Sequence, residues 1–201
     1  MDTNEAIAEI NRFWKCGKFA IPVGGGLSEV QRIEREFKKP LPSWLSAYIE
    51  FVAPNKELHF EKVGNPMTIY PFDQLGARQE GYSFNSVTNE ELNEWKDSWF
   101  LIGDEGADPV IVDLASSEPG LLMAMHGTGD WDFSTIADSF GQLLLCNAAI
   151  HHVMTNWGPD CVVDDENGFN LADEPAGWLF PRMREWSAGY YDDWCSVFEN
   201  Y

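Results

Sequence analysis

The sequence predicts an α+β fold in which helices flank a mostly antiparallel sheet. Three observations predict it: helical spacing of apolar residues near the N-terminus, short β-prone runs between turn residues in the middle, and helical spacing again toward the C-terminus. The chain has 201 residues, 44% of them hydrophobic and 14% aromatic, which fits one large packed domain, or one domain with an appendage.

The N-terminal region predicts a helix over residues 3–15, because five apolar residues fall on one helical stripe. These are Ala6, Ile7, Ile10, Phe13 and Trp14. Asp2 or Thr3 can cap this helix. The pattern then breaks in KFAIPVGGG, and we expect the glycines at positions 24–26 to form a loop or hinge before the main body of the domain.

Two further helices are predicted in the first quarter of the chain. Ser28 is an N-cap candidate with Gln31 three residues later, which is a capping-box pattern, and Pro40 ends this helix. The stretch SWLSAYIEFV, residues 43–52, places its large apolar side chains at helical spacing. Pro42 fits the first turn of that helix, where its missing N–H costs nothing.

Five short runs in the middle of the chain predict strands bounded by Gly, Pro, Asp and Asn. They are residues 58–60, 67–72, 99–103, 110–114 and 121–125. Tight turns over 103–109 and 116–120 join the last three runs. Because such turns cannot hold the crossover that parallel strands need, we expect an antiparallel meander. The polar segment 76–97 is expected to be a loop with a short helix.

Another helix is predicted from about Ser134 to His151, with Gly141 as a weak point. Residues 160–177 are acidic and turn-rich, and the tail after them carries an aromatic stripe at helical spacing. The stripe consists of Trp186, Tyr190, Trp194, Val197 and Phe198. The expected organisation is an N-terminal helix at 1–20, a central α+β domain at 21–155, and an extension at 156–201 that packs on the same domain.

The chain is strongly acidic. It has 13 basic and 33 acidic residues, which gives a formal net charge of −20. This field repels phosphate backbones and anionic lipid surfaces, so neither a nucleic acid nor a membrane is expected as a partner. A basic protein is the natural complement. The acidity is equally compatible with keeping an aromatic-rich protein in solution.

The cysteines and the N-terminus bear on location. Cys16, Cys146, Cys161 and Cys195 are widely spaced, without a CxxC or zinc-type pattern, so no metal site is predicted. The first ten residues carry acids instead of a basic and then apolar stretch, and no apolar run has membrane-spanning length. We therefore expect a protein of the reducing cytoplasm.

Catalytic motifs are missing from the sequence: it contains no GxSxG, HExxH or GxxxxGK[ST]. The best local constellation is His126 with Asp130 and Asp132, which could serve acid–base chemistry or a metal. Surface acids near a lone histidine are more often structural or simply solvated. We predict no enzyme, no catalytic residue and no cofactor, and a small metal-dependent hydrolase that uses His126 is the less favoured alternative.

Three segments carry a family pattern in a fixed order. SEVQRIEREFKKPLPSWLSAYIEFV, residues 28–52, has a helix that ends before Leu-Pro, followed by a helix with aromatic residues. WFLIGDEGADPVIVDL, residues 99–114, is a hydrophobic strand, an acidic Gly-rich turn and a second strand that ends in Asp. HGTGDWDFSTIADSFGQLL, residues 126–144, is a strand exit that leads to a helix. Together they resemble the SUKH superfamily, also known as the Smi/Knr-type domain, over roughly residues 20–150.

The resemblance implies a sheet of about four to six mostly antiparallel strands flanked by helices. Many bacterial members are immunity proteins that neutralise polymorphic or contact-dependent toxins, frequently nucleases, and a fungal branch regulates cell-wall synthesis through protein interactions. We therefore expect a non-catalytic protein-binding module, an immunity protein whose partner is a basic toxin domain such as a nuclease. A regulatory scaffold of cell-wall synthesis is the alternative.

The acidic turns form the candidate binding surface. Three acids share one predicted turn, and three more are expected at neighbouring strand ends, where they can surround an aromatic anchor. The predicted partner-binding residues are Asp104, Glu105, Asp108, Asp113, Asp130, Trp131 and Asp132. Trp99 is a further candidate anchor. The alternative is a solvated acidic surface with both tryptophans in the core.

Overall fold

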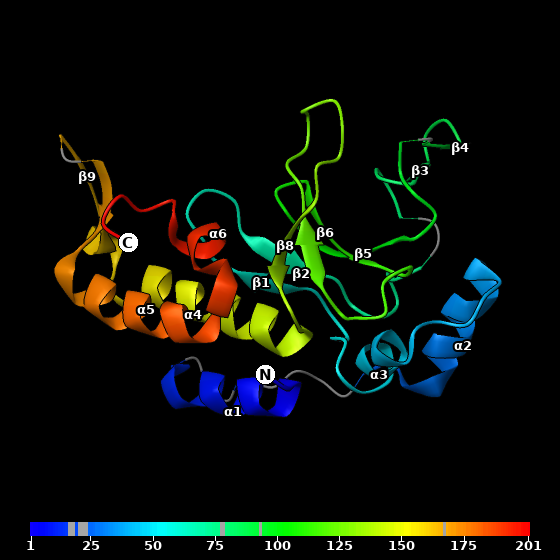
Figure 1. Cartoon of the computed structure of the whole chain (residues 1–201), viewed down its shortest axis with the longest axis horizontal. Coiled ribbons are helices and arrows are strands. Elements are labelled where there is room, and N and C mark those ends of the chain that lie inside the picture. The colour runs from blue at the N-terminus through cyan, green and yellow to red at the C-terminus, as the bar shows by residue number, and fades with distance from the viewer. Residues whose placement is uncertain (16–18, 20–23, 77–78, 93, 167) are drawn as a thin grey trace. The chain divides into compact units, whose positions relative to one another are not determined.

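In the computed structural model, which describes residues 1–201 except 16–18, 20–23, 77–78, 93 and 167, the chain has the predicted α+β fold. The main sheet has six strands in the order β1-β2-β5-β6-β7-β8 (Figure 1). Their bounds are β1 Leu58–Phe60, β2 Met67–Ile69, β5 Trp99–Glu105, β6 Asp108–Asp113, β7 Leu121–Met123 and β8 Ser134–Ala137. Strand β5 pairs antiparallel with β6, and β6 pairs antiparallel with β7, which confirms the predicted meander.

The chain divides into two compact units, each built from separate stretches of sequence. The first unit comprises Met1–Ala20, Phe60–Met67 and Ile136–Tyr201. The second comprises Ile21–His59 and Thr68–Thr135. The chain therefore alternates between the two units along its length.

Helix α4 (Phe140–Asn156) is the centre of the first unit and contacts both α1 (Thr3–Phe13) and α5 (Asp173–Trp186) (Figure 1). Every residue of α4 from position 140 to 150 is buried, as expected for a helix that is covered on all sides. Helix α1 begins as predicted, with Asp2 as its N-cap in a capping box with Glu5.

The predicted helix start at Ser134 is wrong. Residues 134–137 form strand β8, and α4 begins only at Phe140, where the Ser139 side chain accepts a hydrogen bond from the Gln142 backbone N–H. The β-branched pair Thr135 and Ile136 favours a strand, and a serine N-cap then starts the helix. Gly141 is required for packing, because a Cβ atom there would lie 2.7 Å from the carbonyl oxygen of Asp2.

The predicted turn-rich stretch at 160–177 contains a hairpin that the sequence did not indicate. Strands β9 (Val162–Asp165) and β10 (Gly168–Leu171) pair antiparallel, and α5 begins at Asp173. The aromatic stripe of the tail is also not one helix. Helix α5 ends at Trp186, and a short 3₁₀ turn in which Ala188 has φ 52° separates it from α6 (Tyr191–Cys195).

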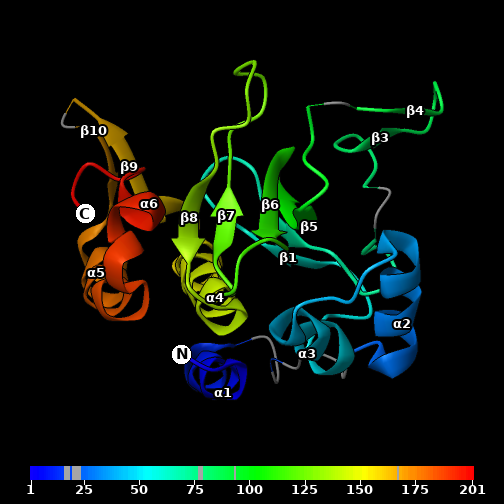
Figure 2. The ribbon, with the colours of Figure 1, turned by 45° about the vertical axis from the view of Figure 1, so that its right-hand side comes forward.

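Helices α2 (Gly26–Phe37) and α3 (Ser43–Phe51) contact each other in the second unit (Figure 2). The predicted capping box at Ser28 is wrong, since α2 starts two residues earlier and the Ser28 hydroxyl donates to the Gly25 carbonyl. The helix ends at Phe37, before Pro40, because Lys38 adopts a left-handed conformation. The predicted loop is confirmed at Gly24 and Gly25 but is wrong at Gly26, which is the first residue of α2, and residues 20–23 lie outside the described residues.

The strand alternation gives the sheet of the second unit two apolar faces. Leu101, Ile111 and Leu122 are cross-strand neighbours on one face. Phe100, Val112 and Leu121 are neighbours on the opposite face, where the Phe37 ring of α2 lies 5.6 Å from the Phe100 ring. Both faces therefore need a cover.

The loop regions of the second unit differ from the expectation in two places. The turn between β5 and β6 consists only of Gly106 and Ala107, both with positive φ, so it is shorter than the predicted 103–109. No helix occurs between 76 and 97 in the residues that the structure describes. This segment instead contains a small hairpin of β3 (Phe84–Asn85) and β4 (Glu90–Glu91). Among the described helices, none has the length and apolar character needed to cross a bilayer.

Candidate partner-binding site

The β5–β6 hairpin gathers three of the predicted site residues at one end of the sheet. Glu105 pairs with Asp108 in the register, and Asp104 is one pair farther from the turn. Asp113 does not belong to this group, because it pairs with Trp99 at the other end of the same two strands. A six-residue strand separates its ends by about 17 Å, so the prediction that Asp113 shares the rim is wrong.

The loop that follows β7 brings in two more predicted acids. Because Met123 pairs with Val110, the chain leaves β7 beside the start of β6. The Asp108 carboxylate accepts a 2.7 Å hydrogen bond from the His126 backbone N–H, which ties the loop to the hairpin. Asp130 and Asp132 are exposed farther along this loop, which projects beyond the strands in Figure 2.

His126 has a different carboxylate neighbour from the one expected. Its Nδ1 lies 2.6 Å from Asp108 Oδ1, and its side chain is 56% exposed. In the described part of the chain, no group of three or more His, Cys, Asp or Glu residues is arranged to hold a metal ion. The exposed His126 and the half-buried Asp108 therefore form a pair that holds the loop, and the described residues offer the hydrolase alternative no gathered ligand set.

The described cysteine thiols are not accessible at the surface. Cys146, Cys161 and Cys195 are buried and free, while Cys16 lies outside the described residues. Burial is the main cause that raises the pKa of Cys195 to about 12, and it raises the pKa of Cys146 further. A thiolate nucleophile is disfavoured at these two positions.

An aromatic cluster, rather than helices, covers the Leu101 and Ile111 face of the sheet. Trp95 and Trp99 are buried in it, and Tyr70, Tyr82, Leu122, Trp131 and Phe133 pack against it. Trp99 is only 8% exposed, so it is not an exposed anchor. Trp131 is half-buried, with its ring 5.8 Å from Trp95 and 6.1 Å from Tyr82. It remains available at the border between this cluster and the acidic loop.

Two tyrosines that the sequence did not point to connect the cluster with the acids. The Tyr70 hydroxyl donates to the Asp104 carboxylate, and the Tyr82 hydroxyl donates to the Ala107 carbonyl at 2.9 Å. Burial is the largest cause that raises the pKa of both phenols, followed by the hydrogen bond to Asp104 for Tyr70 and by the negative charge of Asp104 for Tyr82, so both remain donors at neutral pH. The tip of the hairpin is thus held from beneath while its acids stay at the surface.

A cleft of about 1050 Å³ lies beside this region in the second unit. Its lining combines cations with acids and aromatic rings, and includes Arg32, Glu36, Lys38, Lys39, Trp95 and Lys96. Asp73, Glu91 and Asp97 also line it, so the cleft carries both signs of charge. Its shape does not by itself favour one kind of ligand.

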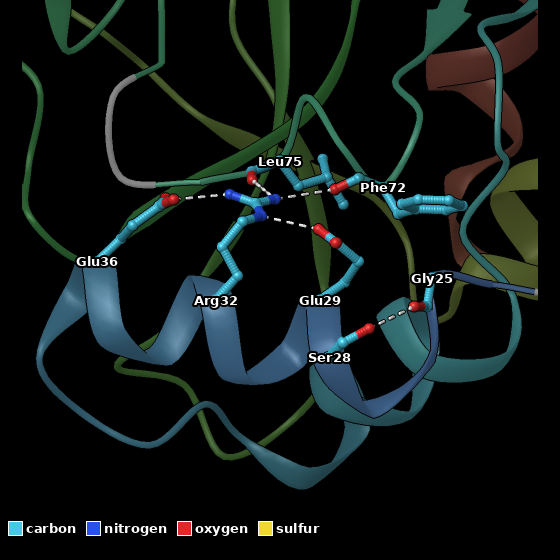
Figure 3. A network of polar contacts seen from close by, with 7 residues as sticks. All are labelled: Gly25, Ser28, Glu29, Arg32, Glu36, Phe72 and Leu75. Carbon is cyan, nitrogen blue, oxygen red and sulfur yellow. Dashed lines mark hydrogen bonds and ion pairs between the residues drawn. The ribbon is translucent and has the colours of Figure 1, made fainter.

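Arg32 fixes one wall of the cleft through four acceptors (Figure 3). Its Nε and Nη1 donate to the carboxylates of Glu29 and Glu36, each at 2.7 Å. Its Nη2 donates to the carbonyls of Phe72 and Leu75 at 3.1 and 2.7 Å. The guanidinium therefore joins α2 to the segment that follows β2, before the chain enters the loop that covers the sheet.

Comparison with known families agrees with this architecture. The model of the SMI1 / KNR4 family (SUKH-1) matches residues 26–146, which is more than half of the chain and contains α2, α3 and all six strands of the main sheet. A search of curated proteins gave no match. The resemblance to the SUKH superfamily is confirmed, and the chain belongs to the SMI1 / KNR4 family (SUKH-1).

Proposed function

We propose that this chain is a non-catalytic protein-binding module of the cytoplasm that neutralises a bacterial toxin as its immunity protein. The binding surface is the acidic hairpin end, which we define as Asp104, Glu105, Asp108, Asp130 and Asp132, with Trp131 at its border. The partner is a basic protein, such as a nuclease toxin domain. Family membership and the net charge of −20 support the class of partner.

The observation that carries the proposal is the convergence of acids from two separate segments at one end of the sheet. Asp104 and Asp108 are held by Tyr70 and by the His126 backbone, so their carboxylates are already oriented before binding. Pre-oriented groups lose less conformational entropy when a partner binds. A cationic surface of the partner can therefore bind the Asp104 and Asp108 carboxylates without first having to order them.

Apolar groups beside these acids complete the arrangement expected of an interface. Met125 is 69% exposed in the same loop as Asp130, and Trp131 is half-buried between them and the aromatic cluster. Protein interfaces typically place aromatic and methionine side chains inside a polar rim. We infer that Trp131 is the anchor and that the acids set the rate of encounter and the orientation of the partner.

The test uses the product of the gene adjacent to the one that encodes this chain, co-expressed with the chain and also mixed with it in purified form. Protection of cells and a direct complex are expected. Asp130→Lys should slow association about three- to tenfold, with little effect on dissociation, and the difference should shrink as salt rises. Asp130 is exposed, so this change leaves the core intact.

The matched control is Glu118→Lys, which makes the same change in charge in the exposed connection between β6 and β7, at the opposite end of these strands. Equal association rates for the two variants would remove the acidic hairpin end from the proposal. Absence of both binding and protection would remove the immunity function itself.

A further inference from the structure

Two tryptophans and two cations form a second distinctive surface, which lies in the first unit. Trp157 follows α4 and Trp178 belongs to α5, and their ring centroids are 5.8 Å apart. Lys15 Nζ lies 5.8 Å from the Trp157 ring, and the Arg182 guanidinium lies 4.6 Å from the Trp178 ring. We call these four residues the tryptophan–cation surface.

The four side chains of this surface are all at least partly exposed to solvent. The Lys15 side chain is exposed, and Arg182 and both tryptophans are half-buried. The rings are supported from below by His152, which is buried at 4.6 Å from Trp178 and 5.2 Å from Trp157. The two rings are therefore packed from one side, and their remaining exposed parts and both cations are in reach of a ligand.

The charge of this surface is the reverse of that of the chain as a whole. Among the described residues, neither Lys15 nor Arg182 has a carboxylate within ion-pair distance, although acids outnumber bases 33 to 13. The Arg182 guanidinium lies over the Trp178 ring and donates to the Trp178 carbonyl at 2.7 Å. Burial lowers the pKa of His152 to about 4, and the positive charges of Lys15 and Arg182 contribute to this shift.

We propose that the tryptophan–cation surface binds an acidic segment of a protein partner, with carboxylates on Lys15 and Arg182 and apolar side chains on Trp157 and Trp178. Guanidinium and ammonium groups favour carboxylates, and a half-buried tryptophan favours flat apolar groups. A short segment feels mainly the two nearby cations, because screening limits electrostatic reach to about 8 Å at physiological salt. A long phosphate backbone would extend over the acidic remainder of the chain.

This surface is separate from the acidic hairpin end in residues and in the sign of its charge. All four of its residues also lie outside positions 26–146, the segment that the family model matches. The N-terminal helix and the C-terminal extension thus add a binding surface of their own to the family domain. The proposal does not depend on the immunity function.

The experiment titrates the full chain with a short, capped peptide of alternating glutamate and phenylalanine, followed by tryptophan fluorescence and calorimetry. Saturable binding is expected. Arg182→Gln and Lys15→Gln should each weaken it about fivefold or more, since each removes one carboxylate partner. Arg12→Gln is the matched control, because the Arg12 guanidinium is already paired with Glu9, and it should leave the affinity unchanged.

Several outcomes would overturn the proposal. These are absence of binding, equal binding of a lysine–phenylalanine peptide, tighter binding of a single-stranded RNA oligonucleotide, or insensitivity to Lys15→Gln. Lys15 is exposed, so its variant remains informative even if Arg182→Gln unfolds the protein. A concentration-dependent dimer that is lost in Lys15→Gln would assign the surface to a second copy of this chain and would also refute the proposal.

Discussion

Replacement of Arg32 tests how the wall of the cleft is held. Its side chain donates to two carboxylates on its own helix and to two backbone carbonyls about forty positions away in sequence. Arg32→Ala leaves the Phe72 and Leu75 carbonyls without this donor, and it leaves Glu29 and Glu36 without the cation between them. Arg32→Lys keeps a positive charge but replaces the planar fork with a single ammonium group.

The expected cost can be worked out contact by contact. The two charge-assisted bonds to carbonyls contribute about 1.5 kcal/mol each. The two ion pairs within the helix contribute only about 0.5 kcal/mol each, because the side chain is 29% exposed and water screens them. Arg32→Ala should therefore lower the free energy of unfolding by about 3–4 kcal/mol, and Arg32→Lys by about 2 kcal/mol, mainly through the lost carbonyl bonds.

Urea unfolding gives the stability change, and amide hydrogen exchange shows where it acts. Faster exchange is expected in the segment around Phe72 and Leu75, ahead of the rest of the sheet. Arg35→Ala is the control, because Arg35 is an exposed residue of the same helix. If Arg32→Ala cost no more than Arg35→Ala, or if exchange around Leu75 did not change, the reasoning about this network would fail.

Two further predictions concern the helices of the first unit. Gly141→Ala should lower the free energy of unfolding in urea by about 1–2 kcal/mol, because the clash of the new Cβ atom with Asp2 outweighs the higher helix propensity of alanine. Gly177→Ala in α5 is the control and should be neutral or stabilising, because a Cβ atom there meets nothing within 4 Å. His152 has its pKa lowered to about 4 by burial and nearby cations, so it stabilises the fold fully above about pH 6.5 and loses this contribution as pH falls toward 4. Between pH 7.5 and 5 the wild type should lose roughly 1–2 kcal/mol more stability than His152→Gln, and an equal loss in both would contradict this assignment.

The sequence predicted those parts of the fold that depend on local spacing. The stripe at Ala6 and Ile10, the strands near Trp99 and Val110, and their antiparallel order are all read directly from apolar periodicity and short turns. It failed at Ser134, because a strand of four residues that runs into a capped helix leaves the apolar spacing nearly continuous. The β9–β10 hairpin was missed because each strand has only four residues and includes Asp, Gly or Asn, which are typical of turns.

The site was predictable only in part, for a related reason. Asp104, Glu105 and Asp108 are close in sequence, so their proximity follows from one turn. Asp113 was misplaced because it follows nearly the whole length of the second strand, so it lies at the end of β6 opposite the turn whatever the length of that turn. The roles of Tyr70 and Tyr82 depend on contacts across the sheet, which no local pattern in the sequence encodes.

The burial of α4 from Phe140 to Ile150 limits how this protein can be shortened. The segment matched by the family model stops at Cys146, in the middle of that helix, and excludes both α1 and α5. A truncated chain with those limits would expose the apolar sides of a severed helix to water and would aggregate or be degraded. We therefore expect the smallest unit that folds to be larger than the segment that the family model matches, and to need the flanking helices α1 and α5.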